Sequence, residues 1–421
     1  MLYYHLGLLL PRAMEVSAAH GLGNGYAFGD DFYPIWLTTR QWRVAQRDPY
    51  SPEMTREIQT GLFGRALDSR IPTDPADLRV FAHPAYADIL FWPAAELPFQ
   101  QARVVVVALL AVGTLASVLL WMQVLSWRLS WNWLCVAALL TLCSYPALEG
   151  LFAGQAGMLV AFLLAASVVC LQKGKLLLAG ILAALGTIKP QVSLLAIVFF
   201  FLWSCHDWRI RRRFCAGFLL AMFFLIGASL MIWPHWIQSW THAVREYHGY
   251  AQPALISQVL ASWVGPGWAG PATFVAIAGL IGIAVARAWQ NRAAAPESLT
   301  FCFTLNFLLA ITAVALLPGQ AVYDHVILLP GILLVLQHGR DFRQAGRIPR
   351  TLLAVGAIVL FWPWAAAFAL IAIRPWLSAD HFFSNGLLAL PIRTAAALPF
   401  AVLMLLFYFR RASANLKREL S

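Results

Sequence analysis

The sequence predicts an all-α polytopic membrane protein, a bundle of about 11 to 12 transmembrane helices with one large polar segment near its start. Hydrophobic residues make up 61% of the 421 positions and charged residues 12%, whereas a soluble domain carries about 25% charged residues. Apolar runs of about 18 residues or more, long enough to cross a hydrocarbon core, recur from Gln101 to the C-terminus. The mean hydropathy of +0.70 agrees with this class.

The positive charges indicate the direction of each crossing. The formal net charge is +11, but Lys and Arg fall mainly in short gaps between apolar runs. This is the positive-inside pattern of membrane proteins, so the charge does not predict a nucleic-acid partner. Working back from the basic C-terminal end, the rule predicts five cytoplasmic positions: 128, 173–175, 209–213, 287–297 and 340–350. The segments predicted outside are 21–100, 151–152, 235–266, 318–324 and 374–390.

One interval requires two crossings. Residues 173–175 and 209–213 are both predicted inside, and a single apolar stretch, 176–203, lies between them. Roughly 28 helical residues would reach about 42 Å, too long for one span and too short for two full ones. We predict a hairpin of two short helices bent at "IKPQ", because Pro190 removes a backbone donor and disfavours a helical conformation at Lys189. Broken backbone at membrane depth is tolerated where it is buried in protein or lines a cavity.

The first stretch, "MLYYHLGLLLPRAMEV", has about ten apolar residues before Pro11, too few to span a membrane. It also lacks the basic start and cleavage site of a secretory signal. Two interpretations stay open: a start downstream of the natural one, or a short first helix that continues through residues 18–19 despite its charges.

Residues 21–100 form the large outside segment of a single domain (1–421) whose transmembrane bundle covers 101–421. This segment holds ten acids against seven arginines. Two of the acids, Asp30 and Asp31, are adjacent in "GDDFYPIW". Near its end, "HPAYADILFWPAAELPF" is too short to span and predicts an interfacial helix with Trp92 at headgroup level.

The six cysteines lie in or beside apolar runs and show no CxxC spacing. We therefore predict neither a disulfide framework nor a metal site. The chain also has no P-loop and no G-x-G-x-x-G after a strand, so no nucleotide or other cofactor is expected.

Several motifs occur in order over roughly residues 29–200. They are "GDDFYPIW", "DPYSPE", "FAHPAYADILFWPAAELPF", "GQAGMLVAFLL" and "LAGILAALGTIKPQVSLL". In these stretches the chain resembles the GT-C class of integral membrane glycosyltransferases. More narrowly, it resembles glycosyltransferase family 87, the polyprenyl-phosphate-mannose-dependent mannosyltransferases and their relatives. It departs from the family pattern at His83 (usually Tyr), Ala85 (usually Pro) and Gly157 (usually Asn).

The resemblance implies transfer of a hexose, with mannose as the expected sugar, from a polyprenyl-phosphate donor to an envelope glycolipid or glycan acceptor. The site would face the extracytoplasmic side of the inner (plasma) membrane, in contact with membrane lipids. Such a transfer needs a base to take the proton of the acceptor hydroxyl. The resemblance implies Asp31 as that base, with Asp30 as the alternative. Without the family resemblance, the same two aspartates predict an N-cap of the following helix.

Lys189 is the only one of four lysines within an apolar run, where a charge is costly unless it is paired or wet. We expect it to neutralise the donor phosphate; the alternative is that it snorkels to an interface. Gln191 and Gln155 are expected either to donate hydrogen bonds to phosphate or sugar or to satisfy buried backbone near the bend.

Two further groups complete the expected site. "YDHVILLP" places Tyr323 and His325 at the outer end of a helix, where His325 is expected to contact phosphate or acceptor, or else to be an interfacial histidine. His83 and Tyr86 close the first loop and are expected to line an acceptor groove.

Two other classes of function compete with the enzyme. A transporter or flippase of lipid-linked sugars would use the bent hairpin and Lys189 as a substrate pathway, and should not need Asp31. A non-catalytic scaffold would tolerate loss of either residue.

Overall fold

The computed structural model describes residues 1–23, 28–68, 70–319, 321–384 and 386–419. Every regular element within these ranges is a helix, apart from one β-bridge between Ala254 and Pro318. The all-α class predicted from the sequence is therefore confirmed.

Five helical stretches in the described residues are long and apolar enough to cross a membrane. They are α5 (Phe99–Val124), α11 (Trp208–Ile232), α14 (Pro266–Gln290), α18 (Arg347–Ile373) with η4 (Arg374–Trp376), and η5 (Leu387–Ala389) with α20 (Leu390–Ala395) and α21 (Leu398–Glu419). A pair bent by 58°, α6 (Trp131–Leu142) and α7 (Tyr145–Ala153), makes a sixth candidate.

Shorter apolar helices fill the interior. They are α8 (Ala156–Gln172), α9 (Leu176–Leu185) with η2 (Gly186–Ile188), α10 (Pro190–His206), α13 (Leu255–Val264), α15 (Leu299–Ala315), and η3 (Val322–Leu328) with α16 (Leu329–Gln337). Helix α15 is buried throughout residues 301–315, whereas only 6% of the α14 span is buried. An all-round apolar helix belongs in a core. The expected crossings, about 11 to 12, are reached only if these short helices also cross.

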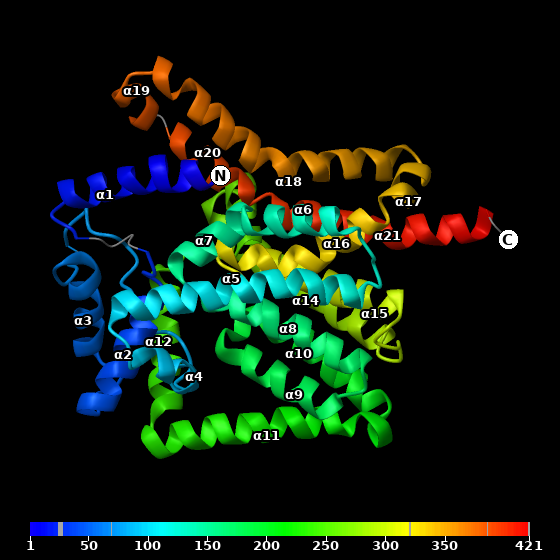
Figure 1. Cartoon of the computed structure of the whole chain (residues 1–421), viewed down its shortest axis with the longest axis horizontal. Helices are drawn as coiled ribbons and strands as arrows, with labels where there is room; N and C mark the ends of the chain where they lie inside the picture. Colours follow the sequence, from blue (N-terminus) through cyan, green and yellow to red (C-terminus); the bar gives the residue numbers. More distant parts are fainter. Residues whose placement is uncertain (24–27, 69, 320, 385, 420–421) are drawn as a thin grey trace.

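The two ends of the bundle differ in content (Figure 1). One end carries α1 (Leu10–Ala19), α2 (Phe32–Ala45), α3 (Pro52–Phe63) and α12 (Trp236–Tyr250), and the other carries α17 (Gly339–Gln344) and the C-terminus. The remaining elements are η1 (Tyr4–Leu9), α4 (Tyr86–Ala95) and α19 (Ala379–Ser384).

Hydrogen bonds join the gaps that the charge rule assigned to the same side. At one end, Arg211 Nη1 donates to the carbonyls of Trp203 and Arg292, at 2.9 and 3.1 Å. At the other end, Trp240 Nε1 donates to the carbonyl of Ala82 at 2.9 Å. The predicted cytoplasmic gaps therefore gather at one end and the predicted outside segments at the other.

The predicted hairpin is present, and it breaks at Lys189. Its φ and ψ of −131° and 78° interrupt the helix between η2 and α10. Helix α9 runs parallel to α11, since Gly180 lies against Phe214 and Thr187 lies near Met222. The end of α10, in contrast, returns to the start of α11, where Trp203 accepts from Arg211. Helices α9 and α10 are thus antiparallel.

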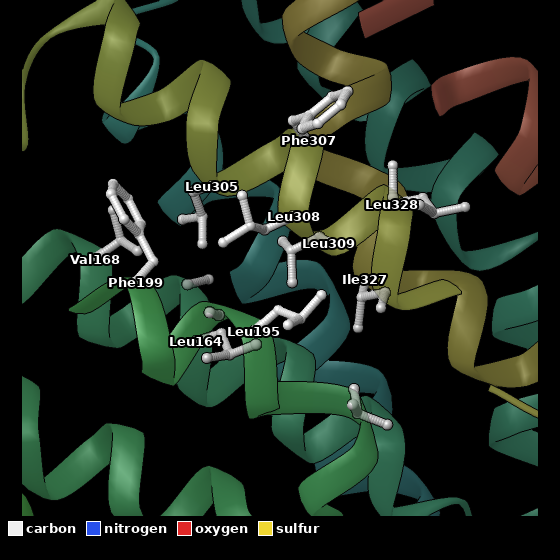
Figure 2. Packing of buried hydrophobic residues seen from close by; sticks show 14 of the residues in the cluster. Leu164, Val168, Leu195, Phe199, Leu305, Phe307, Leu308, Leu309, Ile327 and Leu328 are labelled. Atoms are coloured by element: carbon white, nitrogen blue, oxygen red, sulfur yellow. The ribbon is translucent and has the colours of Figure 1, made fainter. Parts of the chain in front are cut away.

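The interior between α8, α10, α15 and η3 is filled by apolar side chains (Figure 2). Leu164 and Val168 of α8 face Leu195 and Phe199 of α10, with side chains of α15 and η3 above them. Close packing of this kind fixes the relative height of the helices. It therefore fixes Lys189, just before α10, relative to η3.

Helix α2 is held to α4 through a buried carboxyl. Asp88 is fully buried, and its Oδ1 accepts from Thr38 Oγ1 and Thr39 Oγ1 at 3.0 and 3.1 Å. Because α2 begins directly after Asp31, this contact orients the segment that carries the acidic pair. The predicted interfacial placement of α4 stays a prediction.

The N-terminal segment is helical from Tyr4 to Ala19, through η1 and α1. It continues past Pro11 and the exposed Arg12–Glu15 pair, as the second interpretation of this stretch expected. Its start is held by a hydrogen bond from the hydroxyl of Tyr4 to the carbonyl of Leu388. The ring of His5 packs edge-on against Tyr145 and Phe152, so η1 lies beside α7 and near the acidic motif.

Candidate functional site

The acidic pair lies where its backbone crosses the end of α7. Gly29 N donates to the carbonyl of Phe152 at 2.7 Å, and Asp31 N donates to that of Ala153 at 3.1 Å. Gly29 takes a φ of +83°, a conformation that favours glycine. The crossing is also close at Gly154, where a Cβ would lie 2.8 Å from Phe32 Cβ.

Asp31 stands at the N-cap position of α2, but its side chain caps no amide within the described residues. The capping interpretation is wrong for Asp31. Its φ and ψ of −82° and −20° are already helical, which is not the extended conformation of a capping residue. Its carboxylate is instead free to take part in longer-range contacts.

Arg79 holds both acids. Its Nη1 lies 2.5 Å from Asp31 Oδ1, and its Nη2 lies 3.1 Å from Asp30 Oδ2. A forked guanidinium can hold two carboxylates at a fixed spacing. Arg79 itself has a φ of +55°, an uncommon value for a residue with a side chain. Sequence reasoning missed this residue, and "DLRVF" carries no local signal for it.

The two acids differ in environment. The Asp30 side chain is 10% exposed and that of Asp31 is 24% exposed. Burial, followed by the charge of Asp31, raises the pKa of Asp30 well above its ordinary value, although Arg79 opposes the shift. Burial thus works against the ionised form of Asp30, and Asp31 is the more accessible carboxylate of the pair.

A chain of contacts leads from Asp31 into the bundle. Gln155, at the start of α8, donates from Nε2 to Asp31 Oδ2. Its Oε1 accepts from Lys189 Nζ at 2.9 Å. Lys189 Nζ lies 2.8 Å from both carboxylate oxygens of Asp324 and 4.7 Å from the centre of the Tyr323 ring. The amide of Gln155 thus links the carboxylate of Asp31 to the buried ammonium of Lys189.

Lys189 is therefore paired inside the protein. It is 7% exposed and Asp324 is fully buried, which contradicts the alternative of a lysine that snorkels to an interface. Gly157 makes room for the pair, because a Cβ there would lie 2.0 Å from Asp324 Oδ1. The Asp324 carboxylate thus fills the space beside position 157, where the family pattern has Asn.

His83 and Tyr86 lie against the turn that precedes Lys189. The Tyr86 hydroxyl contacts the Thr187 hydroxyl and carbonyl at 2.9 and 3.0 Å, and His83 Nδ1 lies 3.5 Å from the Ile188 carbonyl. Burial, and then the charge of Lys189, lower the pKa of His83 to about 4, so its imidazole is neutral at pH 7. Both residues therefore support η2, and the acceptor groove expected for them stays a prediction.

Gln191, one residue after Pro190, is half-buried and stands outside the contact chain in the described structure. His325 is 2% exposed, and its Nδ1 has no hydrogen-bond partner among the described residues. No group of three or more His, Cys, Asp or Glu side chains suited to a metal ion occurs in those residues either.

One cavity borders the contact chain and a second lies near it. An acidic cavity of about 250 Å³ contains Asp30, Asp31 and Arg79 in its wall, together with Tyr323. An apolar cavity of about 410 Å³ lies among α5, α6, α16 and α18 and reaches His325, next to Asp324 in sequence. The polar cavity thus borders the contact chain at Asp31 and Tyr323, and the apolar one comes near it at His325.

The fold and the contact chain define an integral membrane protein with a carboxylate pair and a buried cation where its first polar segment meets the bundle. The sequence model of glycosyltransferase family 87 matches residues 81–318, more than half of the chain. The chain belongs to glycosyltransferase family 87 and is a membrane glycosyltransferase. No curated protein and no solved structure matches it.

The matched range contains His83, Tyr86, Gln155, Lys189 and Gln191. It begins after the acidic pair and ends before Tyr323 and His325. Two of the residues outside the range contact residues inside it: Asp31 contacts Gln155, and Tyr323 contacts Lys189.

Proposed function

We propose that the protein transfers a hexosyl group, mannose above all, from a polyprenyl-phosphate donor to a hydroxyl of an envelope glycolipid or glycan. The reaction would take place on the extracytoplasmic side of the plasma membrane. The observation that carries this proposal is the single amide of Gln155, which contacts Asp31 at one end and Lys189 at the other. A base and a phosphate-binding cation are the two groups that the transfer requires.

Asp31 is proposed as the base. It is the more exposed acid of the pair and lies in the wall of the acidic cavity. Arg79 and Gln155 fix its two oxygens, so its orientation is set before substrate binds. Preorganised groups of this kind need little rearrangement during the reaction. Asp30, the predicted alternative, is held by the same arginine but is more deeply buried, and burial raises its pKa.

Lys189 is proposed to neutralise the phosphate that leaves. A compact ammonium is a suitable point charge for phosphate. In the structure Lys189 is balanced by Asp324, so an incoming phosphate would share the lysine with this carboxylate. Tyr323, whose ring covers Nζ, would border the same position.

The apolar cavity is proposed to hold the lipid chain of the donor. Its wall is made mainly of aliphatic and aromatic side chains, among them Trp133, Leu140, Leu336 and Trp364. An isoprenoid chain is purely apolar and gains free energy from burial in such a site. His325 lines this cavity, and its Nδ1 has no partner among the described residues, so it would donate to the phosphate where the lipid chain begins.

The chemical step follows from these positions. The acceptor hydroxyl oxygen forms a bond to the anomeric carbon of the donor sugar, and its proton goes to Asp31. The bond between the anomeric carbon and the phosphate oxygen breaks, and its electron pair stays on the phosphate. The products are a new glycoside and a polyprenyl phosphate whose charge Lys189 balances.

The test is transfer of radiolabelled mannose from synthetic polyprenyl-phosphate mannose to a host-membrane lipid extract. Asp31→Asn keeps the shape of the side chain but cannot take the proton, so we expect a loss of about 10²-fold or more. Asp68→Asn, an exposed aspartate that is paired with Arg70, is the matched control and should transfer normally.

Equal transfer by wild type and Asp31→Asn would remove Asp31 from the role of base. Movement of the labelled lipid across the vesicle membrane without sugar transfer would contradict the proposed transfer reaction and favour a flippase. A flippase would need Lys189 but not Asp31, so the same variants separate the two functions.

A further inference from the structure

The acidic cavity extends beyond Asp30 and Asp31 toward the N-terminal helix. Its wall is formed by η1, α1, α7, the acidic motif and the loop around Arg79. The lining residues are His5, Leu9, Leu10, Ala13, Asp30, Asp31, Asp77, Arg79, Glu149, Phe152, Ala153 and Tyr323. Four of these side chains carry carboxyl groups and one carries a guanidinium, so acidic groups outnumber the single basic one.

Glu149 is the carboxylate that the proposed chemistry does not use. It lies on α7, on the side of the cavity formed by the N-terminal segment. Its Oε2 accepts from the hydroxyl of Tyr145 at 3.0 Å, and its side chain is 30% exposed. This leaves carboxylate oxygen accessible from the cavity. Because Tyr145 itself is buried, it fixes the direction of the carboxylate.

His5 contributes a second, independent feature. It is only 5% exposed, yet its Nδ1 has no hydrogen-bond partner in the described part of the chain. The nearest carboxylate oxygen, Glu149 Oε2, is 3.6 Å away, beyond hydrogen-bond distance. A buried polar nitrogen without a partner is costly. In the wall of a cavity, it indicates that a ligand supplies the missing partner.

We infer that this cavity is the acceptor subsite. It binds the uncharged sugar whose hydroxyl is glycosylated, and Glu149 with His5 determines its specificity. The inference rests on the proposed function and adds to it a site and a class of acceptor. Glu149 accepts from hydroxyls next to the attacking one, and His5 Nδ1 bonds to another.

The charge and size of the cavity set the class of ligand. Carboxylates form charge-assisted hydrogen bonds with hydroxyl groups but repel phosphate and carboxylate. The volume of about 250 Å³ lies below the roughly 300–1,000 Å³ of pockets for drug-sized ligands. It therefore suits one sugar unit. The ring of Phe152, which packs edge-on against His5 with centroids 4.9 Å apart, gives the sugar an apolar wall.

The position of the cavity separates acceptor from donor. Asp31 lies in its wall and is connected through Gln155 to Lys189 on the other side. A phosphate is favoured at Lys189 and disfavoured beside Glu149 and Asp77. The base therefore lies between the two substrates, as attack of one on the other requires.

The test separates acceptor binding from donor binding. In the mannose-transfer assay, Glu149→Gln and His5→Ala should each raise the KM for acceptor about tenfold and leave the KM for donor within twofold. Methyl α-D-mannopyranoside should compete with the acceptor in the wild type, whereas its 6-phosphate should not. Glu57→Gln, which removes an exposed carboxylate of α3, is the matched control and should keep both KM values.

A merely structural role for Glu149 would lower the amount of folded protein without changing the ratio of the two KM values. An increase in the KM for donor alone, or equal competition by the phosphorylated sugar, would overturn the inference. If the wild type transfers no sugar, equilibrium dialysis with tritiated methyl α-D-mannopyranoside tests sugar binding to the cavity on its own. Binding that is lost in Glu149→Gln would support the sugar site without the transferase. No binding by wild type would overturn the site.

Discussion

Asp31 and Lys189 lie at opposite ends of one side-chain amide, that of Gln155. The amide donates to the carboxylate and accepts from the ammonium, which satisfies both of its polar ends. Gln155 is itself fixed, because its backbone N donates to the carbonyl of Gly150 at 2.8 Å where α7 gives way to α8. The spacing between the proposed base and the cation is thus set by a rigid connection of two helices.

Gln155→Ala should reduce kcat/KM for sugar transfer by about 100-fold, because base and cation lose the group that aligns them. Initial rates at several donor concentrations measure this loss. Gln172→Ala is the matched control. Gln172 sits at the other end of α8 and donates to the carbonyls of Val124 and Pro296, both at 3.1 Å. Similar kcat/KM values for the two folded variants would contradict an aligning role of Gln155.

The buried ion pair of Lys189 and Asp324 should contribute measurably to the thermal stability of the protein. Lys189→Met leaves Asp324 fully buried without its cation, and breaking a buried pair in this way costs about 3–5 kcal/mol. We therefore expect a large fall in thermal stability, measured by unfolding of the protein in detergent, together with loss of transfer.

The double variant Lys189→Met with Asp324→Asn distinguishes stability from function. Removal of both charges should restore most of the stability, whereas transfer should stay lost because no cation faces the phosphate. Recovery of transfer in the double variant would show that Lys189 acts only as the partner of Asp324. An unchanged stability of the single variant would contradict the pair itself.

The hairpin could be predicted from the sequence because its determinants are local. The length of the apolar stretch, the basic residues at both ends and Pro190 together required a break near Lys189. The break occurs at Lys189. The grouping of the basic gaps at one end was predictable for the same reason, since they are short segments with an evident composition. The side of the membrane that this end faces stays a prediction.

The site was only partly predictable. Asp31, Gln155 and Lys189 stood in recognisable motifs, and the structure joins them in one chain of contacts. Arg79 stood in no recognisable motif. Its role depends on a left-handed backbone conformation and on contacts with residues 48 and 49 positions away in the sequence. The ion pair of Lys189 with Asp324 spans 135 residues and was likewise not anticipated.

Glu149 and His5 were missed for a related reason. Each looks unremarkable in its own segment, and they come together only when η1 packs beside α7. A carboxylate in an apolar stretch, such as Glu149 in "YPALEGLFAG", is the one signal that could have indicated it, because an acid there is costly without a function. His5 carries no such signal.

Asp88 should make the stability of the protein fall as the pH rises. Burial raises its pKa to about 8, although the hydrogen bonds from Thr38 and Thr39 oppose the shift. In the unfolded chain an aspartate has a pKa of about 4. Between these values the folded protein holds a proton that the unfolded chain releases, so folding loses up to about 1.4 kcal/mol per pH unit. This contribution is complete below about pH 4 and is lost as the pH passes through 8.

Asp88→Asn should flatten this dependence, because the amide keeps an oxygen that accepts from both threonines but does not titrate. Thermal unfolding between about pH 5 and pH 8 measures the slope for each protein. Asp68→Asn is the control: its hydrogen bonds from Arg70 lower the pKa of Asp68, so it stays ionised over this range and its loss leaves the slope unchanged. Asp30 also has a raised pKa and adds a slope of the same sign in every variant, so the quantity to compare is the difference between wild type and Asp88→Asn. Equal slopes in those two proteins would mean that Asp88 is already ionised in the fold, and the contact between α2 and α4 would then be a charged one.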